Sequence, residues 1–443
     1  MSETPTQTLL QRAVRHLAPV MPLLTEVGER FAAAGYELAL VGGPVRDAFL
    51  GRTSPDLDLT TDARPDDIEK VLAGWADATW DLGRAFGTIG ARKGETTLEV
   101  TTYRSDIYDR ASRKPEVRFG HDLADDLVRR DFTVNAMALR LPDLTFVDPY
   151  GGLADLAAGV LRTPTDPEVS FGDDPLRMMR AARFSSQLGF DVAPEAFRAM
   201  REMAASIEMI SAERVRDELV KLLMSPTPRR GLELLVESGI AEHVLPELPA
   251  LALEIDEHHR HKDVYEHSLI VLEQAMALEG PREVPGVEAP TEVEGPDLVL
   301  RLAALLHDIG KPDTRRFEPG GGVSFHHHDL TGARLARKRL QAGGFVVHRQ
   351  VAPAPGDYRF GVEQHVFPAQ ELREDEPVDG GPMPRVAEGH RRFARGRHFA
   401  PDEGAQLLDR LEGPAVGVEK VRVGQGRGAG QRPVTSGGAV AFV

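Results

Sequence analysis

The length and charge of the chain set the first limits on its function. It has 443 residues, enough for about three domains at roughly 150 residues each. Its 53 Lys and Arg residues stand against 69 Asp and Glu residues, so the formal net charge is −16. That balance excludes a protein that holds nucleic acid through bulk positive charge, because each neutralised phosphate needs a nearby cation. The absence of cysteine excludes disulfides, thiolate zinc sites and a cysteine nucleophile.

The first segment of the chain shows no export signal. MSETPTQTLLQRAVRHL lacks the uninterrupted apolar stretch of a signal peptide. No run in the chain approaches the ~20 apolar residues of a membrane span. We therefore expect a cytoplasmic protein with no membrane partner.

Hydrophobic periodicity predicts an α+β protein. Apolar spacing predicts helices over 7–34 and 66–76 and one that opens at Val45, and it predicts strands over 36–43, 56–61, 80–83, 87–94 and 96–104. We expect a small mixed sheet backed by helices. From about residue 170 to 239 helix follows helix, with one continuous helix over 171–189. A His-rich helical block spans about 256–342, interrupted by a loop rich in Pro, Glu and Gly at 280–295.

Two glycines end the first predicted strand, and a helix follows them. Gly42 and Gly43 allow the backbone to approach a phosphate, and a helix N-terminus offers free N–H groups and the positive end of its dipole. Arg46 adds a cation within the first turn. An ordinary strand-to-helix turn has the same pattern, so a phosphate site is predicted here only in combination with the residues that follow.

A pair of carboxylates lies shortly downstream. Asp56 and Asp58 project to the same side of their strand, because residues i and i+2 share a face, while Leu57 points into the core. Adjacent carboxylates repel each other unless a cation joins them, and Mg²⁺ fits because it binds carboxylates together with substrate phosphates. Glu99 on a neighbouring strand is a candidate third carboxylate, with a solvated strand face as the alternative. A pair of metal ions held here activates a hydroxyl and stabilises a leaving pyrophosphate. Together with the glycine turn, the pattern predicts nucleotidyl transfer, and a solvated edge strand is the alternative for the two aspartates.

Four segments in order resemble one protein family. The class II tRNA nucleotidyltransferase and bacterial poly(A) polymerase family, within the polymerase β superfamily, has similar segments in the same order. They are GGPVRDAFLGRTSPDLDLTT (42–61), RRDFTVNAMAL (129–139), VDPYGGLADL (147–156) and DDPLRMMRAARF (173–184). The resemblance covers about residues 20–340. It implies an enzyme that adds C and A from CTP and ATP to the 3′ end of tRNA, with Mg²⁺ and without a nucleic-acid template.

One acid and one arginine form a candidate reader of the incoming base. Asp174 and Arg177 lie three residues apart in the predicted helix and are therefore neighbours on one face. A carboxylate accepts from the amino group of cytosine or adenine while a guanidinium donates to the ring nitrogen, and guanine and uracil present the opposite pattern. A solvated intrahelical ion pair is the alternative. The resemblance implies that Asp174 and Arg177 read the base and that Arg130, Arg180 and Arg183 contact the nucleotide.

A His-Asp pair closes an apolar helix in the third block. LAALLHDIGK places His307 beside Asp308, and His267 lies about 40 residues upstream. This pattern resembles the HD superfamily of metal-dependent phosphohydrolases, in which imidazole and carboxylate groups hold a divalent ion that activates water. We therefore expect a second divalent metal here. The alternative is an inactive HD scaffold that contacts tRNA, because the further Asp of the superfamily pattern cannot be placed.

The motifs divide the chain into four parts. We expect a nucleotidyltransferase head over 20–160, a helical neck and body over 161–253, an HD domain over 254–342 and an atypical tail over 343–443. The tail holds 17 of the 43 glycines and no isoleucine. A disordered extension, a divergent domain and a shifted reading frame each explain the tail, and we favour the shifted frame because the change is abrupt.

Three other functions stay open at this stage. A poly(A) polymerase, which adds AMP to RNA 3′ ends, has the same head and neck. The second is an HD phosphohydrolase with a vestigial head. The third is a non-catalytic RNA-binding protein, and the Asp56/Asp58 pair argues against it. We also expect Arg214, Arg216, Arg229 and Arg230 to supply phosphate contacts for tRNA despite the net charge.

Overall fold

The structure is a computed structural model. It describes residues 5–53, 56–104, 120, 122–253, 263–279, 295–319, 322–351 and 358–363. The chain divides into two compact units, Met1–Pro246 and Glu247–Val443, and each is described by itself. Within the described ranges, no helix has both the length and the apolar character needed to cross a membrane.

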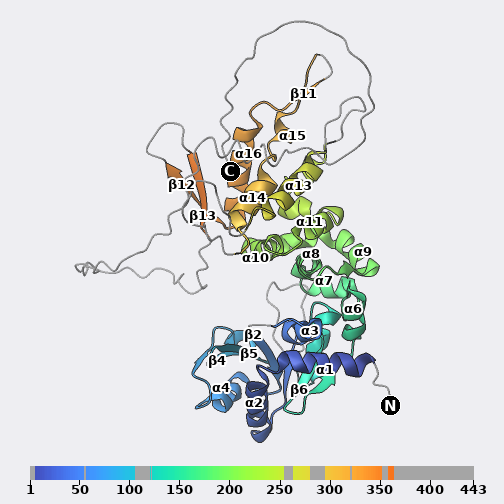
Figure 1. Cartoon of the computed structure of the whole chain (residues 1–443), viewed down its shortest axis with the longest axis vertical. Coiled ribbons are helices and arrows are strands. Elements are labelled where there is room, and N and C mark those ends of the chain that lie inside the picture. The colour runs from blue at the N-terminus through green and yellow to red at the C-terminus, as the bar shows by residue number, and fades with distance from the viewer. Residues whose placement is uncertain are drawn as a thin grey trace, which may run out of the picture. The chain divides into compact units, whose positions relative to one another are not determined.

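A seven-stranded mixed sheet forms the centre of the head, the part of the first unit that ends at residue 158 (Figure 1). The strand order is β3-β4-β5-β2-β1-β6-β7. Neighbouring strands pair antiparallel except β2 and β5, which are parallel. The strands are β1 (Leu38–Val41), β2 (Asp56–Thr61), β3 (Ala78–Trp80), β4 (Thr88–Lys93), β5 (Thr96–Thr102), β6 (Ala138–Leu141) and β7 (Thr145–Val147).

Helices cover one face of this sheet. Leu57 and Leu98 are paired in register and both are 1% exposed, which confirms that Leu57 points into the core. α2 packs against β1 and β6, and α4 against β4 and β5. The helices of the head are α1 (Pro5–Leu17), α2 (Met21–Ala33), α3 (Gly43–Leu50), α4 (Pro65–Leu72), α5 (Leu123–Val128) and α6 (Gly152–Ala158), with 3-10 turns η1 (Arg84–Phe86) and η2 (Thr133–Asn135).

Three predicted boundaries in the head are wrong. The expected helix over 7–34 is two helices, and Pro22 lies in the first turn of the second one, where a missing backbone N–H costs nothing. The strand expected at 80–83 ends at Trp80, because the chain turns there into η1. The helix expected over 66–76 ends at Leu72.

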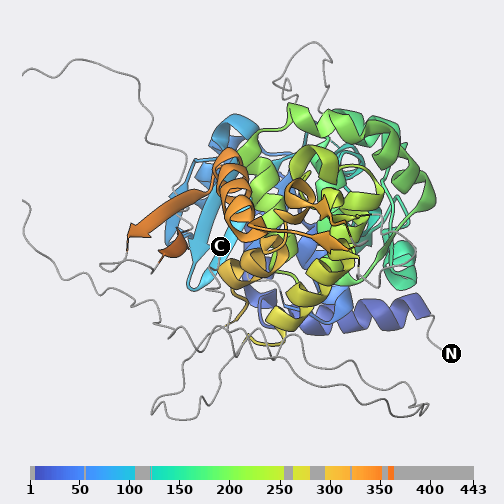
Figure 2. The same ribbon diagram turned by 90° about the horizontal axis from the view of Figure 1, so that it is seen from above.

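Helices make up nearly all of the neck, which follows the head in the same unit. α8 packs against both α10 and α11, and these helices gather in one bundle, coloured green in Figures 1 and 2. A side chain at Gly231 would lie 2.6 Å from the carbonyl oxygen of Ala182, so glycine permits this close approach. The elements are β8 (Val160–Leu161), α7 (Pro167–Asp173), α8 (Leu176–Leu188), β9 (Asp191–Val192), α9 (Pro194–Met203), η3 (Ala204–Met209), α10 (Ala212–Leu223), α11 (Pro228–Glu237) and α12 (Ala241–Val244).

The helix predicted over 171–189 is interrupted at Asp174. α7 ends at Asp173, Asp174 is extended with φ −145° and ψ 99°, and α8 begins at Leu176. Pro175 explains the break, because a proline ring disfavours helical geometry in the residue before it. The prediction that Asp174 and Arg177 share a helix face is therefore wrong: Asp174 precedes the helix that contains Arg177.

The second unit is a smaller helical assembly. α13 packs against α14 through Val271, Ala275 and Ala304, and α15 packs against α16. β12 and β13 pair antiparallel inside the predicted tail, and residues 364–443 lie outside the described residues. The elements are η4 (Pro249–Leu251), α13 (Val264–Met276), α14 (Leu298–Leu306), α15 (Lys311–Thr314), β10 (Arg316–Phe317), β11 (Val323–Ser324), α16 (His328–Ala342), β12 (Val346–Val351) and β13 (Tyr358–Glu363).

Candidate functional site

Three predicted carboxylates lie together on the open face of the head sheet. In the parallel pair of β2 and β5, Asp58 stands opposite Glu99, and Asp56 stands opposite Thr97. Because directly paired residues point to the same side of a sheet, Asp56, Asp58 and Glu99 share the face opposite to the buried leucines. The structure therefore joins two sequence segments that are far apart into one acidic group.

Two of the three carboxylates have a raised pKa. Burial raises the pKa of Asp58 above the ordinary value, and the negative charge of Asp56 adds to this, while Arg130 opposes it. Burial also raises the pKa of Glu99, and the charges of Asp58 and Asp56 add to the effect. A hard divalent cation would relieve this repulsion, because it pairs best with several carboxylate oxygens.

The glycine turn before α3 lies directly beside this acidic group. Gly42 has φ +73°, a left-handed conformation that favours glycine. A side chain at Gly42 would lie 2.9 Å from a terminal nitrogen of Arg130 and 3.8 Å from Oδ2 of Asp58. The turn, the arginine and the carboxylate thus surround one small space, as the prediction of a phosphate site requires.

An ion pair holds Arg130 in place beside the glycine turn. The fully buried carboxylate of Asp126 accepts hydrogen bonds from Arg129 and, at 3.1 Å, from Arg130. These positive charges hold the pKa of Asp126 below its usual range although burial alone would raise it. The Nε of Arg130 is buried and has no hydrogen-bond partner among the described residues. With one terminal nitrogen held by Asp126, the other lies beside Gly42, where it can donate to a phosphate oxygen.

A chain of hydrogen bonds connects α3 in the head to α8 in the neck. Arg46 donates to Oδ1 of Asn135 at 2.8 Å, and Asn135 donates to Asp131 at 2.9 Å. Asp131 accepts from Nε of Arg180 at 2.7 Å. Burial alone would raise the pKa of Asp131, but Arg180 and Asn135 outweigh it and hold that pKa well below its usual range. The two predicted nucleotide contacts Arg46 and Arg180 are therefore fixed by one network.

Asp174 and Arg177 occupy different environments at the start of α8. Oδ1 of Asp174 accepts from the backbone N–H of Leu176 at 3.2 Å, and Oδ2 pairs with Arg214 at 2.9 Å. Arg177 is 8% exposed and donates to Oγ of Ser170 at 2.8 Å and to the carbonyl oxygen of Arg129. Sequence reasoning expected Arg214 only as a phosphate contact and missed its pairing with Asp174.

Arg183 lies in the interior of the neck rather than at the acidic group. Its Nε donates to Oε2 of Glu218 at 2.5 Å, its NH1 donates to Gln187 at 2.8 Å, and its guanidinium lies 3.9 Å from the ring centre of Phe184. Burial lowers the pKa of Arg183, although Glu218 opposes that effect. Glu218 was not predicted, and its place on α10 carried no signal in the sequence alone.

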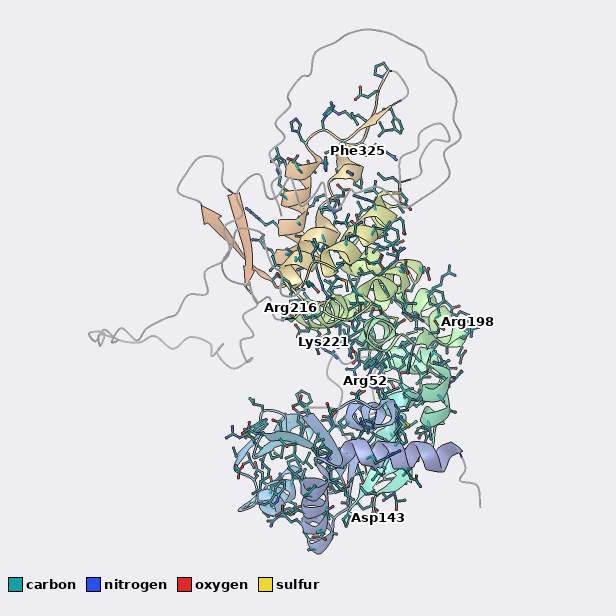
Figure 3. The ribbon with its side chains drawn as sticks, in the orientation of Figure 1. Arg52, Asp143, Arg198, Arg216, Lys221 and Phe325 are labelled. Atoms are coloured by element: carbon teal, nitrogen blue, oxygen red, sulfur yellow. The ribbon has the colours of Figure 1, made fainter. Side chains whose placement is uncertain are left out.

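The other arginines expected to bind RNA phosphates lie in ion pairs on the neck. Arg216 pairs with Asp217 at 2.8 Å, Arg229 pairs with Glu233 at 2.8 Å, and Arg230 pairs with Asp191. Arg216 lies with Lys221 on α10, and Arg198 lies on α9 (Figure 3). Ion pairs near the surface, such as these three, contribute ~0–1 kcal/mol to stability. Each arginine can therefore exchange its carboxylate partner for an RNA phosphate at little cost in free energy.

The predicted His-Asp group forms a compact cluster in the second unit. His267, His307 and Asp308 each bring one ligand atom within 4.8 Å of the others, a closeness that the head carboxylates, among the described residues, do not reach. Nε2 of His307 lies 3.1 Å from Oδ2 of Asp308, and Nε2 of His267 lies 3.8 Å from it. Imidazole and carboxylate groups at this spacing fit a divalent metal.

Two further residues belong to this cluster and were missed. Nζ of Lys311 lies 2.6 Å from Oδ2 of Asp308, and Nε2 of His328 lies 3.6 Å from Oδ1. Burial raises the pKa of Asp308, but His307 and Lys311 outweigh it and hold that pKa well below its usual range. The HDIGK segment and the three histidines at 326–328 were the available signals. The HHRH segment at 258–261 lies outside the described residues.

Backbone contacts set the orientation of two of the histidines. Nδ1 of His307 lies 2.8 Å from the carbonyl oxygen of Ala304, and Nδ1 of His328 lies 2.9 Å from that of Phe325. An Nδ1–H that donates to a carbonyl leaves the Nε2 lone pair for a metal. A side chain at Gly310 would lie 2.1 Å from the carbonyl oxygen of His328, so glycine lets α16 come this close.

Family models match three successive segments of the chain. The Poly A polymerase head domain matches residues 38–162, the probable RNA and SrmB-binding site of polymerase A matches 189–251, and the HD domain matches 264–376. Fold and domain content thus define a polymerase-type head joined to an RNA-binding segment and an HD domain. These three domains are the ones that the sequence motifs led us to expect.

The similar proteins support the same family. The CCA-adding enzyme of Levilactobacillus brevis is 40% identical over 231 residues, which cover 52% of this chain and 57% of that protein. The CCA-adding enzyme of Bacillus subtilis is 39% identical over 227 residues, 51% of this chain and 54% of that one. The chain thus spans little more than half of these relatives. A solved tRNA-processing enzyme complex has the same fold, with a TM-score of 0.50, 23% identity and coverage of 71% and 74%.

Proposed function

We propose that this chain is a CCA-adding tRNA nucleotidyltransferase that transfers CMP from CTP and AMP from ATP to the 3′ end of tRNA. The observation that carries the proposal is the position of Asp58, with Glu99 on one side and the Gly42 turn with Arg130 on the other. One substrate phosphate between these groups would meet both a metal-binding acid and cationic donors. The similarity to CCA-adding enzymes over about half of their length supports the same activity.

The groups around the site suggest a division of labour. Gly42, Gly43 and Arg46 would hold the triphosphate at the start of α3, and the terminal nitrogen of Arg130 that lies beside Gly42 would donate to a phosphate oxygen. Asp56 and Asp58, with Glu99 as the third carboxylate, would bind Mg²⁺. When bound, Mg²⁺ supplies positive charge that makes the 3′-hydroxyl of tRNA more acidic and balances the charge of the leaving pyrophosphate. The 3′-oxygen forms the new bond to the α-phosphorus while the bond to pyrophosphate breaks.

Base selection would fall to the start of α8. The carboxylate of Asp174 accepts from the amino group of C or A, and Arg177 donates to the ring nitrogen next to it. Both side chains are fixed by neighbours: Asp174 by its ion pair with Arg214, and Arg177 by its hydrogen bond to Ser170. Fixed donors and acceptors of this kind reject G and U because their polar groups stay unpaired. Arg180, fixed by Asp131, would complete the contacts, and Arg183 would support them from the neck interior through Phe184.

The test is nucleotide incorporation into a defined RNA. The full chain is incubated with tRNA that lacks CCA, Mg²⁺ and each labelled triphosphate in turn. We expect C and then A to be added and G and U to be rejected, and Asp58→Asn to abolish both additions. Asp66→Asn is the matched control, because it changes an exposed carboxylate of the same head. Absence of C and A incorporation by the unaltered chain contradicts the proposal.

The product distinguishes the rival activities. A poly(A) polymerase would use ATP alone and lengthen any RNA 3′ end beyond one A. An HD phosphohydrolase is the second candidate function, favoured by the cluster around Asp308. For that activity, phosphate release from nucleotides or cyclic phosphates must persist in Asp56→Ala and disappear in Asp308→Asn. We also propose domain limits at residues 160, 253 and 342 and a cytoplasmic location. A shifted reading frame remains our proposal for the tail.

A further inference from the structure

A single row of residues crosses the open face of the head sheet from the acids to its edge. Asp58 on β2 is paired with Glu99 on β5, Glu99 with Gly90 on β4, and Gly90 with Trp80 on β3. Paired residues point to the same side of a sheet, so Trp80 faces the same side as the carboxylates. With ~4.8 Å between neighbouring strands, Trp80 begins roughly 10 Å from Glu99.

The missing side chain of Gly90 brings the indole ring inward from the edge. A side chain at Gly90 would lie 2.0 Å from Nε1 and 2.1 Å from Cε2 of Trp80. The indole therefore lies across Gly90 and fills the place between its own strand and Glu99. Trp80 is half-buried, whereas Trp75 is only 3% exposed. The ring of Trp80 is thus part of the open face and not part of the core.

The position of the cationic groups indicates which substrate meets this ring. Arg46 on α3 and Arg130 beside Gly42 both lie on the β1 side of Asp58. Hydrogen bonds through Asn135 and Asp131 connect Arg180 to Arg46 on that same side. A phosphoryl displacement places the attacking and leaving oxygens in line on opposite sides of the phosphorus. If the pyrophosphate leaves toward the arginines, the attacking 3′-hydroxyl approaches from the side of β5, β4 and β3.

We propose that Trp80 is a stacking platform for the base of the 3′-terminal nucleotide of the RNA that is being extended. The inference rests on the proposed function, because it assigns the second substrate of that same site. Aromatic stacking accepts every base, since every base has a π-face. That property suits a strand end whose last base changes after each addition. Arg92 is exposed one row along on the same face, in the row that continues through Thr97 to Asp56, and supplies a cation for the RNA backbone.

The two tryptophans of the chain allow a direct binding test. Trp75→Phe leaves Trp80 as the single fluorophore, and Trp80→Phe leaves the buried Trp75 as its matched control. Each full-length variant is titrated with an acceptor-stem RNA hairpin, without divalent ions or triphosphates, so that no transfer takes place. We expect the hairpin to quench the Trp75→Phe protein and to leave the Trp80→Phe protein unchanged. A hairpin with an abasic 3′-terminal nucleotide is expected to bind ~10-fold more weakly without quenching.

A kinetic arm separates stacking from a purely structural role. Trp80→Leu is expected to raise the KM for RNA about 10-fold and to leave the KM for CTP unchanged, and Trp80→Phe is expected to restore most of the RNA affinity. Equal quenching by the intact and abasic hairpins, or quenching by CTP alone, overturns the platform. So does an equal rise of both KM values in Trp80→Leu. Because the fluorescence arm needs no turnover, failure of the proposed transfer reaction is recognised separately by the incorporation assay.

Discussion

Replacing Asp131 would test whether one buried carboxylate holds α3 and α8 together. Its side chain is 7% exposed, and it accepts from Arg180 at 2.7 Å, from Asn135 at 2.9 Å and from the backbone N–H of Phe132 at 2.8 Å. Asp131→Asn keeps the shape of the side chain and removes its charge. A hydrogen bond to a charged group contributes ~1.5–3 kcal/mol, and Arg180, 36% exposed, regains some hydration when it loses its partner. We therefore expect a loss of about 2 kcal/mol.

Asp131→Ala should cost more than Asp131→Asn. It leaves the amide of Asn135 and the N–H of Phe132 without their acceptor, and an unsatisfied buried group adds ~1–3 kcal/mol. Denaturant unfolding followed by tryptophan fluorescence is a suitable assay, because Trp75 and Trp80 both lie in the head. Asp217→Asn, which breaks an exposed ion pair of α10, is the control and should change the free energy of unfolding by less than ~1 kcal/mol. Equal midpoints for Asp131→Asn and Asp217→Asn would refute the reasoning.

The pH dependence of the same variant gives an independent check. Because the pKa of Asp131 is lowered in the folded protein, its contribution to stability is complete at pH values above the ordinary Asp pKa of ~3.9. It is lost as the pH falls below that value toward the folded-state pKa. The difference in midpoint between the unaltered chain and Asp131→Asn should therefore be constant from pH 7 to pH 5 and shrink below about pH 4. A difference that grows with acidity would contradict the network.

Three further predictions follow from contacts elsewhere in the chain. Gly152→Ala should destabilise the head by about 2 kcal/mol, because its Cβ would lie 2.1 Å from the carbonyl oxygen of Thr133. Gly172→Ala, whose Cβ would lie 3.9 Å from its nearest neighbour, is the control, and similar unfolding midpoints for the two variants would contradict the prediction. Arg214→Gln should raise the KM for CTP and ATP about threefold by releasing Asp174, with Arg216→Gln as the control, and unchanged KM values count against that role. Asp308→Asn should weaken Mn²⁺ binding, measured by calorimetry, at least ~10-fold relative to the exposed Asp313→Asn; equal affinities would exclude Asp308 as a ligand.

The local sequence pattern was sufficient to predict that the acidic residues of β2 share a face, but not which residues of other elements they meet. The alternation around Leu57 predicted that Asp56 and Asp58 share a face, and the structure places them so. The register that sets Asp58 opposite Glu99 depends on strands that are distant in sequence, and no periodicity specifies it. The same holds for Glu218, which meets Arg183 only because α10 packs on α8.

Proline explains the clearest error near the candidate base reader. The spacing of Asp174 and Arg177 suggested a shared helix face, but Pro175 ends that pattern. Asp174 therefore lies before α8, and its carboxylate accepts a hydrogen bond from the backbone N–H of Leu176. In the second unit, His307 and Asp308 were identified from adjacent letters. Lys311 lies only three residues beyond Asp308, whereas His328 reaches Asp308 through the close contact between Gly310 and α16.

The parallel pairing of β2 and β5 also bears on how the protein acquires its acidic group during folding. β3 and β4 lie between these strands in sequence, so the chain must close a loop from Thr61 to Thr96 before Glu99 can stand beside Asp58. Such closure is entropically costly and is slow compared with local hairpin formation. Refolding intermediates that have formed only the β4–β5 hairpin lack the three-carboxylate group. Recovery of metal binding should therefore lag behind recovery of secondary structure when the protein refolds.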